Sequence, residues 1–362
     1  MPISAVDAIS PSFQHTKQQL LQPFRAGQWA RLALVGLLAG ELGSGGGCNF
    51  NFNVPQSTNG SQRFLDAGLS AANPTVYAGL IALLIVLGIT LWIVLLYASS
   101  VMRFVLFDSI IAKECRIRQY WVRRQGPGLR FFLWQLLLLL ATIVGITILI
   151  GIPAAIALAL GWLKEPGKHM APLILGGIFL FFVFLVFVVC ILVVSVLTKD
   201  FVVPQMALED ISAIEGWRRL LRMLKPEKGS YAGYLGMKIV MALGAAMVIG
   251  IVSTIAIIIV AIPLGGFSVI AVLTGKTAGL TWNVYTITLA VIVGCFLLAI
   301  IFYVVALIAV PAMVFFPAYS IHFLASRYPA LDALLHPPPV SPAAPEPPAS
   351  PPPLPPEPSP IG

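Results

Sequence analysis

Long runs of apolar residues without a single charge constrain this chain most strongly. The clearest run extends from Val76 to Met102 and holds 27 consecutive uncharged residues. A helix needs about 20 apolar residues to cross the hydrocarbon layer of a membrane, so this run is long enough to span it. Four further runs of similar character cover residues 131–163, 171–198, 239–262 and 284–310. Because backbone groups in lipid must bond to one another, these runs predict helices and an all-α membrane protein.

Composition supports the same class. Hydrophobic residues make up 59% of the 362 residues and charged residues only 10%, and the mean hydropathy is +0.94. These values lie outside the range of soluble globular domains. The four cysteines and four histidines are scattered, without the spacing of a disulfide framework or a metal site. We therefore expect no metal and no other cofactor.

The first apolar segment, Gln28 to Leu42, is shorter than the others. Only Leu32 to Gly40 lacks a charge, so the segment can be read as a span or as a half-inserted helix. Gly36 and Gly40 form a GxxxG pattern, which favours the close approach of a second helix. With this segment counted as a span, we predict a polytopic bundle of about six transmembrane helices, arranged as three hairpins with cytoplasmic amphipathic helices.

Three regions follow from the composition along the chain. Residues 1–26 are predicted to be a cytoplasmic segment with a short surface helix over Asp7–Leu21, broken at Pro11. Residues 27–330 form the membrane domain, and residues 331–362 form a Pro-rich tail. The last 27 residues of the tail include 14 prolines, which predicts a disordered or polyproline II segment. It reads as a spacer unless its PxxP pattern binds a partner.

The distribution of Lys and Arg predicts the orientation. Eighteen of the 22 bases fall in segments that six spans place on one side of the membrane, and four fall on the other. Cytoplasmic loops carry the excess of Lys and Arg, so both termini are predicted to lie in the cytoplasm.

The stretch Lys199–Pro226 between two apolar runs carries the densest mix of acidic, basic and aromatic residues. Ser212 and Glu215 have the spacing of a capping box, which predicts a helix from about Ala213 to Lys225. Its apolar face is predicted to hold Ile214, Trp217, Leu221 and Leu224. Such a helix lies on the membrane surface with Trp at the headgroup level, or else it is a solvated connector packed under the bundle. The candidate anchors to anionic lipid or to a membrane-protein partner are Trp217, Arg218, Arg219 and Arg222.

A threefold repeat is visible in the ends of three apolar runs. They read Phe104-Val-Leu-Phe107, Phe201-Val-Val-Pro204 and Val314-Phe-Phe-Pro317, and a surface segment follows each of them. The surface segment of the first copy has a net charge of +3 from Asp108 to Arg124, which favours docking on anionic lipid. Its candidate anchors are Trp121, Arg123 and Arg124.

Three prolines are candidate helix breaks, because proline lacks the backbone N–H that a helix interior uses. They are Pro153, Pro204 and Pro263. Discontinuous helices are typical of transporters, so the first and third of these prolines are the best argument in the sequence for translocation.

Several short stretches resemble an uncharacterised bacterial family of six-span inner-membrane proteins. They are Pro23-Phe-Arg25, Trp29-Ala-Arg-Leu-Ala33, Asp200-Phe-Val-Val-Pro204, Leu208-Glu209 and Trp217. The layout is similar to that of the membrane domain attached to some glycerophosphodiester phosphodiesterases, over roughly residues 15–330. The resemblance implies a bacterial inner-membrane location. It implies no catalytic residues, because no soluble stretch here is long enough to hold the phosphodiesterase domain.

The absence of ionisable residues from the apolar runs is the main evidence on function in the sequence. Their cores carry no ionisable residue, whereas a coupled transporter usually keeps one at membrane depth. Capping and ion pairing account for Asp200, Glu209 and Asp210, so we expect no enzyme. The basic segments flank the membrane, so we expect no nucleic-acid partner. We predict a non-enzymatic membrane protein that organises a membrane or partner-protein interaction. The alternative is a component that translocates a lipid or an apolar solute.

Overall fold

The computed structural model describes residues 3–41, 74–162, 166–277 and 284–336, and within these ranges all regular secondary structure is helical. The short helices are α1 (Ile9–Leu21), α2 (Ala26–Leu38), α5 (Ile117–Arg123), α8 (Val203–Glu209), α9 (Ala213–Leu224) and α12 (Pro329–Leu335). The long helices are α4 (Pro74–Ile111), α6 (Gln125–Ala159), α7 (Met170–Leu197), α10 (Lys228–Thr277) and α11 (Val284–Ala325). A 3-10 turn, η1 (Pro166–Lys168), precedes α7, and a π-helical turn, η2 (Thr198–Val202), follows it.

Five helical stretches in the described part of the chain are long and apolar enough to cross a membrane. They are Ile81–Ile111, Gln125–Ala159, Met170–Glu209, Lys228–Val260 and Thr288–Ala325. Each contains 31 to 40 residues, well above the roughly 20 that a span requires. The chain is therefore an all-helical multipass membrane protein.

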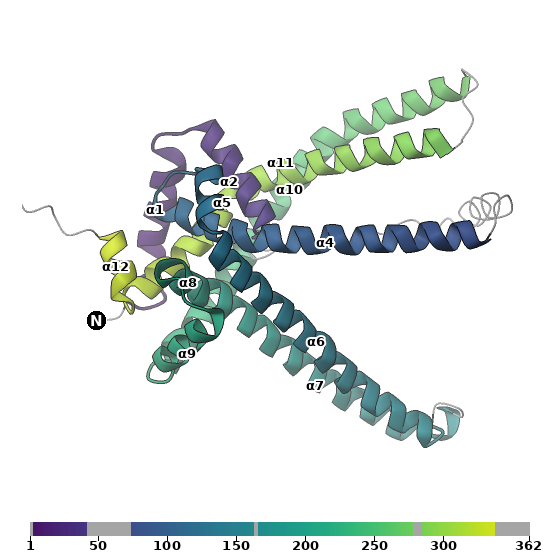
Figure 1. The fold of residues 1–362 in the computed structure, drawn as a ribbon, viewed down its shortest axis with the longest axis horizontal. Helices are drawn as coiled ribbons and strands as arrows, with labels where there is room; N and C mark the ends of the chain where they lie inside the picture. Colours follow the sequence, from purple (N-terminus) through teal and green to yellow (C-terminus); the bar gives the residue numbers. More distant parts are fainter. Residues whose placement is uncertain (1–2, 42–73, 163–165, 278–283, 337–362) are drawn as a thin grey trace, which may run out of the picture.

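The long helices meet at one end of the molecule and diverge toward the other (Figure 1). Helices α6 and α7 run together as one hairpin, α10 and α11 form another, and α4 lies between them. The short helices α1, α2, α5, α8, α9 and α12 gather where the long helices meet. We call these short helices, η2 and the adjoining ends of the long helices the head. The diverging remainder of the long helices we call the arms.

Apolar side chains in the arms are open to the surroundings. The five consecutive residues Leu91 to Leu95 of α4 are each between 42% and 57% exposed. Because one helical turn holds 3.6 residues, five exposed residues in a row leave this part of α4 without a buried face. Large exposed apolar surfaces on a protein mark contact with membrane or with another protein. The arms therefore have the surface of lipid-facing helices.

Buried side chains concentrate in the head, around an aromatic cluster that joins η2, α10 and α11. Phe201, Tyr231, Tyr234, Tyr319 and Phe323 are at most 1% exposed. The ring of Tyr234 lies 4.7 Å from that of Phe323 and 5.0 Å from those of Phe201 and Tyr319. Aromatic pairs at these distances contribute about 0.5–1.5 kcal/mol each beyond the burial of their surface. The head is therefore the well-packed core of this protein.

Helix α2 is a short helix in the head rather than a sixth span. It has 13 residues, or about 20 Å at 1.5 Å per residue, against a hydrocarbon layer of about 30 Å. A Cβ atom built on Gly36 would lie 2.4 Å from Sδ of Met313 in α11, so Gly36 makes the close helix approach that the GxxxG pattern predicted. Gly40 instead turns the chain after the helix, with φ of +75°. The full span predicted over residues 28–42 is not present.

Helix α1 belongs to the head and is not broken at Pro11. Proline in a first turn removes no intrahelical hydrogen bond, so the helix begins at Ile9 and continues to Leu21. It packs against α11. Its buried residues are Ser12, His15, Thr16, Gln19 and Leu20. The surface helix predicted within residues 1–26 is thus half buried.

The packed region extends beyond residue 330, where the membrane domain is predicted to end. Helix α12 carries the packed region to Leu335, with Leu331 fully buried, so the predicted boundary at residue 330 falls inside the head. The predicted Pro-rich tail from residue 337 onward lies outside the described residues. So does the Gly-, Ser- and Asn-rich stretch of residues 42–73.

Two of the three predicted helix breaks are absent. Helix α6 continues through Pro153 and α10 continues through Pro263. A proline in a membrane helix leaves one carbonyl without its usual donor, and neighbouring helix turns can absorb that loss. Pro204, by contrast, stands in the first turn of α8, directly after η2, as expected for a helix start.

The three repeated sequence segments occupy equivalent places in the order of elements. Each lies near the head end of a long helix, in α4, in η2 and the start of α8, and in α11. A short helix follows each of them, namely α5, α9 and α12. Phe104, Phe201 and Val314, which start the three segments, are all fully buried. The repeat therefore marks where the long helices enter the head.

Candidate functional site

The junction between α7 and α8 positions the central stretch. In η2 the backbone N–H of Val203 donates to the carbonyl of Thr198, five residues earlier. This widened turn is followed by Pro204, which lacks the N–H that a regular α-helix would use there. Single π-turns in helices often occur at functional sites. Here the turn places Asp200, 7% exposed, inside the head.

Helix α9 begins where the capping pattern predicted. The Oγ of Ser212 accepts a hydrogen bond of 3.3 Å from the backbone N–H of Glu215, and the helix ends at Leu224, before Pro226. An N-cap of this kind contributes about 1 kcal/mol. The carboxylate of Glu215 accepts from Nη1 of Arg218 at 2.8 Å and lies 3.6 Å from Nε of Arg219. The predicted start of this helix is confirmed, and Glu215 forms ion pairs with two arginines of the same helix.

The buried face of α9 differs from the predicted one. Ala213, Gly216 and Leu220 are buried, whereas Ile214 is 62% exposed and Leu221 is 47% exposed. Gly216 explains the difference, because a Cβ there would lie 2.7 Å from Cγ1 of Val202 in η2. The helix thus approaches η2 through its smallest residue. Apolar periodicity could not reveal this, because it weighs large side chains and ignores glycine.

Three of the predicted anchors are used inside the head. The indole N–H of Trp217 donates to Oγ1 of Thr198 at 3.1 Å. Arg124 donates to both carboxylate oxygens of Asp108 at 2.7 Å and to the carbonyl of Ala207. Bidentate pairs of this kind are strong and geometrically specific. These side chains fasten α5, α8 and α9 to the long helices.

Arg219 is the third anchor used inside the head. It pairs with Glu209, which also accepts a hydrogen bond from the hydroxyl of Tyr328. Burial, with the adjacent Glu209 carboxylate, raises the pKa of Tyr328 to about 12. The interaction therefore joins the end of α8 to the chain between α11 and α12.

The remaining predicted anchors are placed differently. Trp121 is half-buried against Tyr97, with ring centroids 6.4 Å apart, and Arg123 is exposed. Arg218 and Arg222 are also exposed, at 68% and 66% of their side chains. With the neighbouring exposed residues they form a surface that we call the α9 face. It consists of Ile214, Arg218, Leu221, Arg222 and Lys225.

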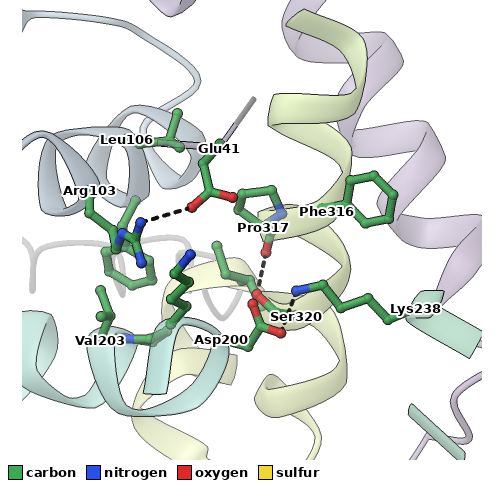
Figure 2. Close-up of a pocket in the computed structure, with 13 residues that line it drawn as sticks. Glu41, Arg103, Leu106, Asp200, Val203, Lys238, Phe316, Pro317 and Ser320 are labelled. Atoms are coloured by element: carbon green, nitrogen blue, oxygen red, sulfur yellow. Dashed lines mark hydrogen bonds and ion pairs between the residues drawn. The ribbon is translucent and has the colours of Figure 1, made fainter. Parts of the chain in front are cut away.

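A group of charged residues that the sequence did not bring together lies buried beneath η2. We call it the buried charge cluster, and its members are Glu41, Arg103, Lys199, Asp200 and Lys238. Nζ of Lys238 donates to Oδ2 of Asp200 at 2.5 Å. The hydroxyl of Tyr234 donates to the same oxygen at 3.0 Å. Figure 2 shows Lys238 and Asp200 facing each other across the cluster.

Arg103 forms the other side of the cluster. Its Nη2 donates to the carbonyl of Ala39 at 2.6 Å and lies 3.5 Å from Oε1 of Glu41; Figure 2 shows this ion pair. The guanidinium carbon lies 5.6 Å from the ring centre of Phe131. The pair thus ties the end of α2 to α4. Nε and Nη1 of Arg103 are buried, and the described residues supply no hydrogen-bond partner for either.

The cluster lines a small, partly open cavity of about 30 Å³. Apolar side chains, including Leu106, Phe107 and Phe316, line it together with the charged groups. Lys199 also lines it and is half-buried. Among the described residues, no carboxylate lies within ion-pair distance of Lys199. The site therefore combines three cations with two carboxylates at one buried point.

Sequence reasoning treated the members of this cluster separately. By sequence, Arg103, Lys199 and Lys238 flank apolar runs, and bases in that position ordinarily lie at the cytoplasmic ends of spans. One signal was available, namely the Lys199-Asp200 pair directly at the end of an apolar run. Consecutive residues of a helix point in different directions, so such a pair readily directs one member toward the neighbouring helices.

This multipass helical membrane protein belongs to a family of unknown function. Residues 3–334 match the Family of unknown function (DUF7544), which covers the head and the arms together. No curated protein and no solved structure matches this chain. Within the described residues, no three His, Cys, Asp or Glu side chains come together in a way that could hold a metal ion.

Proposed function

We propose that this protein is non-enzymatic and organises an interaction in a bacterial inner membrane, with both termini in the cytoplasm. In this proposal the head rests against the cytoplasmic leaflet, and the arms hold lipid or the helices of a membrane-protein partner. The observation that carries the proposal is the contrast between a packed, ion-paired head and arms whose apolar surfaces remain open.

The arms support the proposal through their divergence. The α6–α7 hairpin leans away from the α10–α11 hairpin, and α4 stands between them (Figure 1). Exposed apolar residues occur along all five long helices, for example Leu83, Phe179 and Met247. Helices in lipid associate through close packing rather than through the hydrophobic effect. Arms held apart by their bases therefore leave room for a partner helix or for lipid.

The α9 face supports attachment to anionic headgroups. Ile214 and Leu221 are exposed beside three exposed bases, a combination typical of helices that lie at a membrane surface. Each base near an anionic surface contributes about 1 kcal/mol. Arg123 on α5 is a further exposed base on the head.

The carboxylates near the predicted interface support a non-enzymatic role. Asp200 accepts from Lys238 and Tyr234, and Asp210 pairs with Arg130 at 3.1 Å. Each is occupied by a cation, whereas a general acid or base must be able to exchange a proton with a substrate.

Translocation of a lipid or an apolar solute is the second candidate function. The same divergence of uncharged arms favours it, because an apolar molecule could move between the hairpins without meeting a charge. The helix breaks at Pro153 and Pro263 no longer support it, since both helices are continuous.

Extraction in native lipid nanodiscs followed by mass spectrometry tests the proposal. A stoichiometric protein partner, or a retained set of anionic lipids, is the expected result. The variant Arg218→Gln/Arg222→Gln/Lys225→Gln should lose that partner or those lipids while the fold is kept. Its matched control removes three exposed bases outside α9, Lys17→Gln/Arg25→Gln/Lys228→Gln, and should retain them. An unchanged retention in the α9 variant would contradict the role of this face. A single retained apolar solute without a partner would favour translocation.

A further inference from the structure

The buried charge cluster has more positive than negative charge. Arg103, Lys199 and Lys238 face Glu41 and Asp200 around one cavity, so with all five groups ionised the cluster carries a net charge of +1. A buried charge without a counter-charge is costly, because it loses its hydration and gains nothing in return.

The unmatched donors are found on two of the three cations. Lys238 is paired with Asp200. Arg103 is only 6% exposed, and its Nε and Nη1 have no hydrogen-bond partner among the described residues. Lys199 forms no ion pair there either. The cavity is therefore lined by the buried N–H groups of Arg103 and by the half-buried ammonium of Lys199, and an anion is the acceptor that also corrects the charge.

The size of the cavity restricts the anion. By the same measure, one water molecule requires roughly 10–15 Å³, and this cavity offers about 30 Å³. That is enough for one or two water-sized occupants, whereas a phosphate group would protrude from the cavity. The apolar part of the wall, including Leu106, Phe107 and Phe316, favours an anion that gives up its water easily.

We propose that the cavity between Arg103 and Lys199 binds one small monovalent anion of the halide class. The anion accepts hydrogen bonds from the two cations and brings the cluster to neutrality. It lies where the end of α2, α4, η2 and α10 meet, so its binding stabilises the head at the base of the arms. This inference is independent of the partner or lipid that the arms hold.

Chloride is the probe for the test, with the full-length protein in detergent. The apparent unfolding temperature is measured as chloride replaces gluconate at constant ionic strength, because gluconate is too large for the cavity. A ligand that binds only the folded state stabilises it by mass action. We expect a saturable rise of about 2–4 °C for the wild type. Bromide should act as chloride does, and sulfate should not.

The variant Lys199→Gln separates this proposal from a purely structural role. It removes the cation that has no ion-pair partner, so it should fold and lose the chloride-dependent rise. In chloride-free buffer it should be more stable than the wild type, because the excess charge is gone. Lys225→Gln removes an exposed lysine and should keep the full chloride response. Lys199→Arg keeps the charge and should keep at least part of it.

Three outcomes would overturn the proposal. One is a wild-type unfolding temperature that does not depend on chloride, as expected if the cavity holds water alone. Another is an equal chloride response in wild type and Lys199→Gln. The last is stabilisation of the delipidated protein by phosphatidylglycerol micelles but not by chloride, which would assign the cations to a lipid headgroup.

Discussion

The head and the arms of this protein differ in how far their side chains are buried. In the head, aromatic rings, ion pairs and backbone-directed side chains are buried together, as around Tyr234 and Asp200. In the arms, residues such as Leu83 and Phe179 remain mostly exposed, and the apolar runs carry no charge. The difference shows that the head supplies its own partners, whereas the arms require a solvent or a partner that is apolar. Stability measured in detergent should therefore report on the head.

The largest expected effect comes from breaking the central ion pair of the head. Asp200→Asn leaves Lys238 buried without a carboxylate, and removing one member of a buried pair costs about 3–5 kcal/mol. The apparent unfolding temperature in detergent should fall sharply, or the protein should no longer elute as a single species. Glu114→Gln breaks an exposed pair with Arg116 and should cost no more than about 1 kcal/mol. Similar losses for the two variants would refute the division between head and surface.

The next comparison uses two neighbouring leucines of α9. Leu220 is fully buried, and Leu221 is 47% exposed. Leu220→Ala should destabilise the protein by about 2–5 kcal/mol, whereas Leu221→Ala should change it by less than about 0.5 kcal/mol. Denaturant or thermal unfolding in the same detergent measures both. If Leu221→Ala proved the more damaging, α9 would face the head as apolar periodicity first predicted.

Glycines sharpen the comparison between the head and the arms. A Cβ on Gly36 would meet Met313 at 2.4 Å inside the head, and one on Gly145 would meet Phe187 at 2.5 Å in the arms. Gly36→Ala should cost about 1–3 kcal/mol, because a packed core cannot shift easily. Gly145→Ala should cost less than about 1 kcal/mol, because Phe187 is half-buried and its ring can move. The unfolding temperatures of the Gly36→Ala and Gly145→Ala variants, each compared with the wild type, test this difference.

Gly27 supplies the control for this pair. It lies in the same helix as Gly36, and a Cβ there would meet nothing within 4 Å. Gly27→Ala should leave stability unchanged or raise it by up to about 1 kcal/mol. A Gly36→Ala variant as stable as Gly27→Ala would show that α2 is not packed tightly on α11.

The smallest expected effect is a dependence on pH. His15 donates from Nε2 to the carbonyl of Ile110 at 3.0 Å, and burial lowers its pKa from the usual 6.5. Its contribution to stability is complete above pH 6.5 and is lost as the pH falls toward the lowered value, because the unfolded chain takes up the proton first. Unfolding temperatures at pH 7.5 and 5.5 should therefore differ more for the wild type than for His15→Gln.

The exposed His336 serves as the comparison for that measurement. His336→Gln should retain the pH dependence of the wild type, since its ring is 69% exposed. If the unfolding temperature depended on pH equally in His15→Gln and in the wild type, His15 would not take up a proton on unfolding in this pH range.

The sequence predicted correctly what depends on local pattern. Uncharged runs such as Val76–Met102 identified the long helices, because a span is a matter of length and polarity. Ser212 and Glu215 located the start of α9, because a cap involves residues three positions apart. Pro204 coincides with the change from η2 to α8 for the same local reason.

The buried face of α9, the place of α2 and the buried ion pairs depend on contacts between distant segments of the chain. Gly216 against Val202 determined which face of α9 is buried, and Gly36 against Met313 placed α2 in the head. Asp200 meets Lys238 across 38 residues, and Arg103 meets Glu41 across 62. Charge and hydropathy along a chain identify which residues are costly to bury, but only the packing of the helices determines which of them are buried together. For this protein, the sequence alone determined a multipass helical membrane protein with a basic end. The tertiary structure determined that this end is a packed head built around a buried cluster of opposite charges.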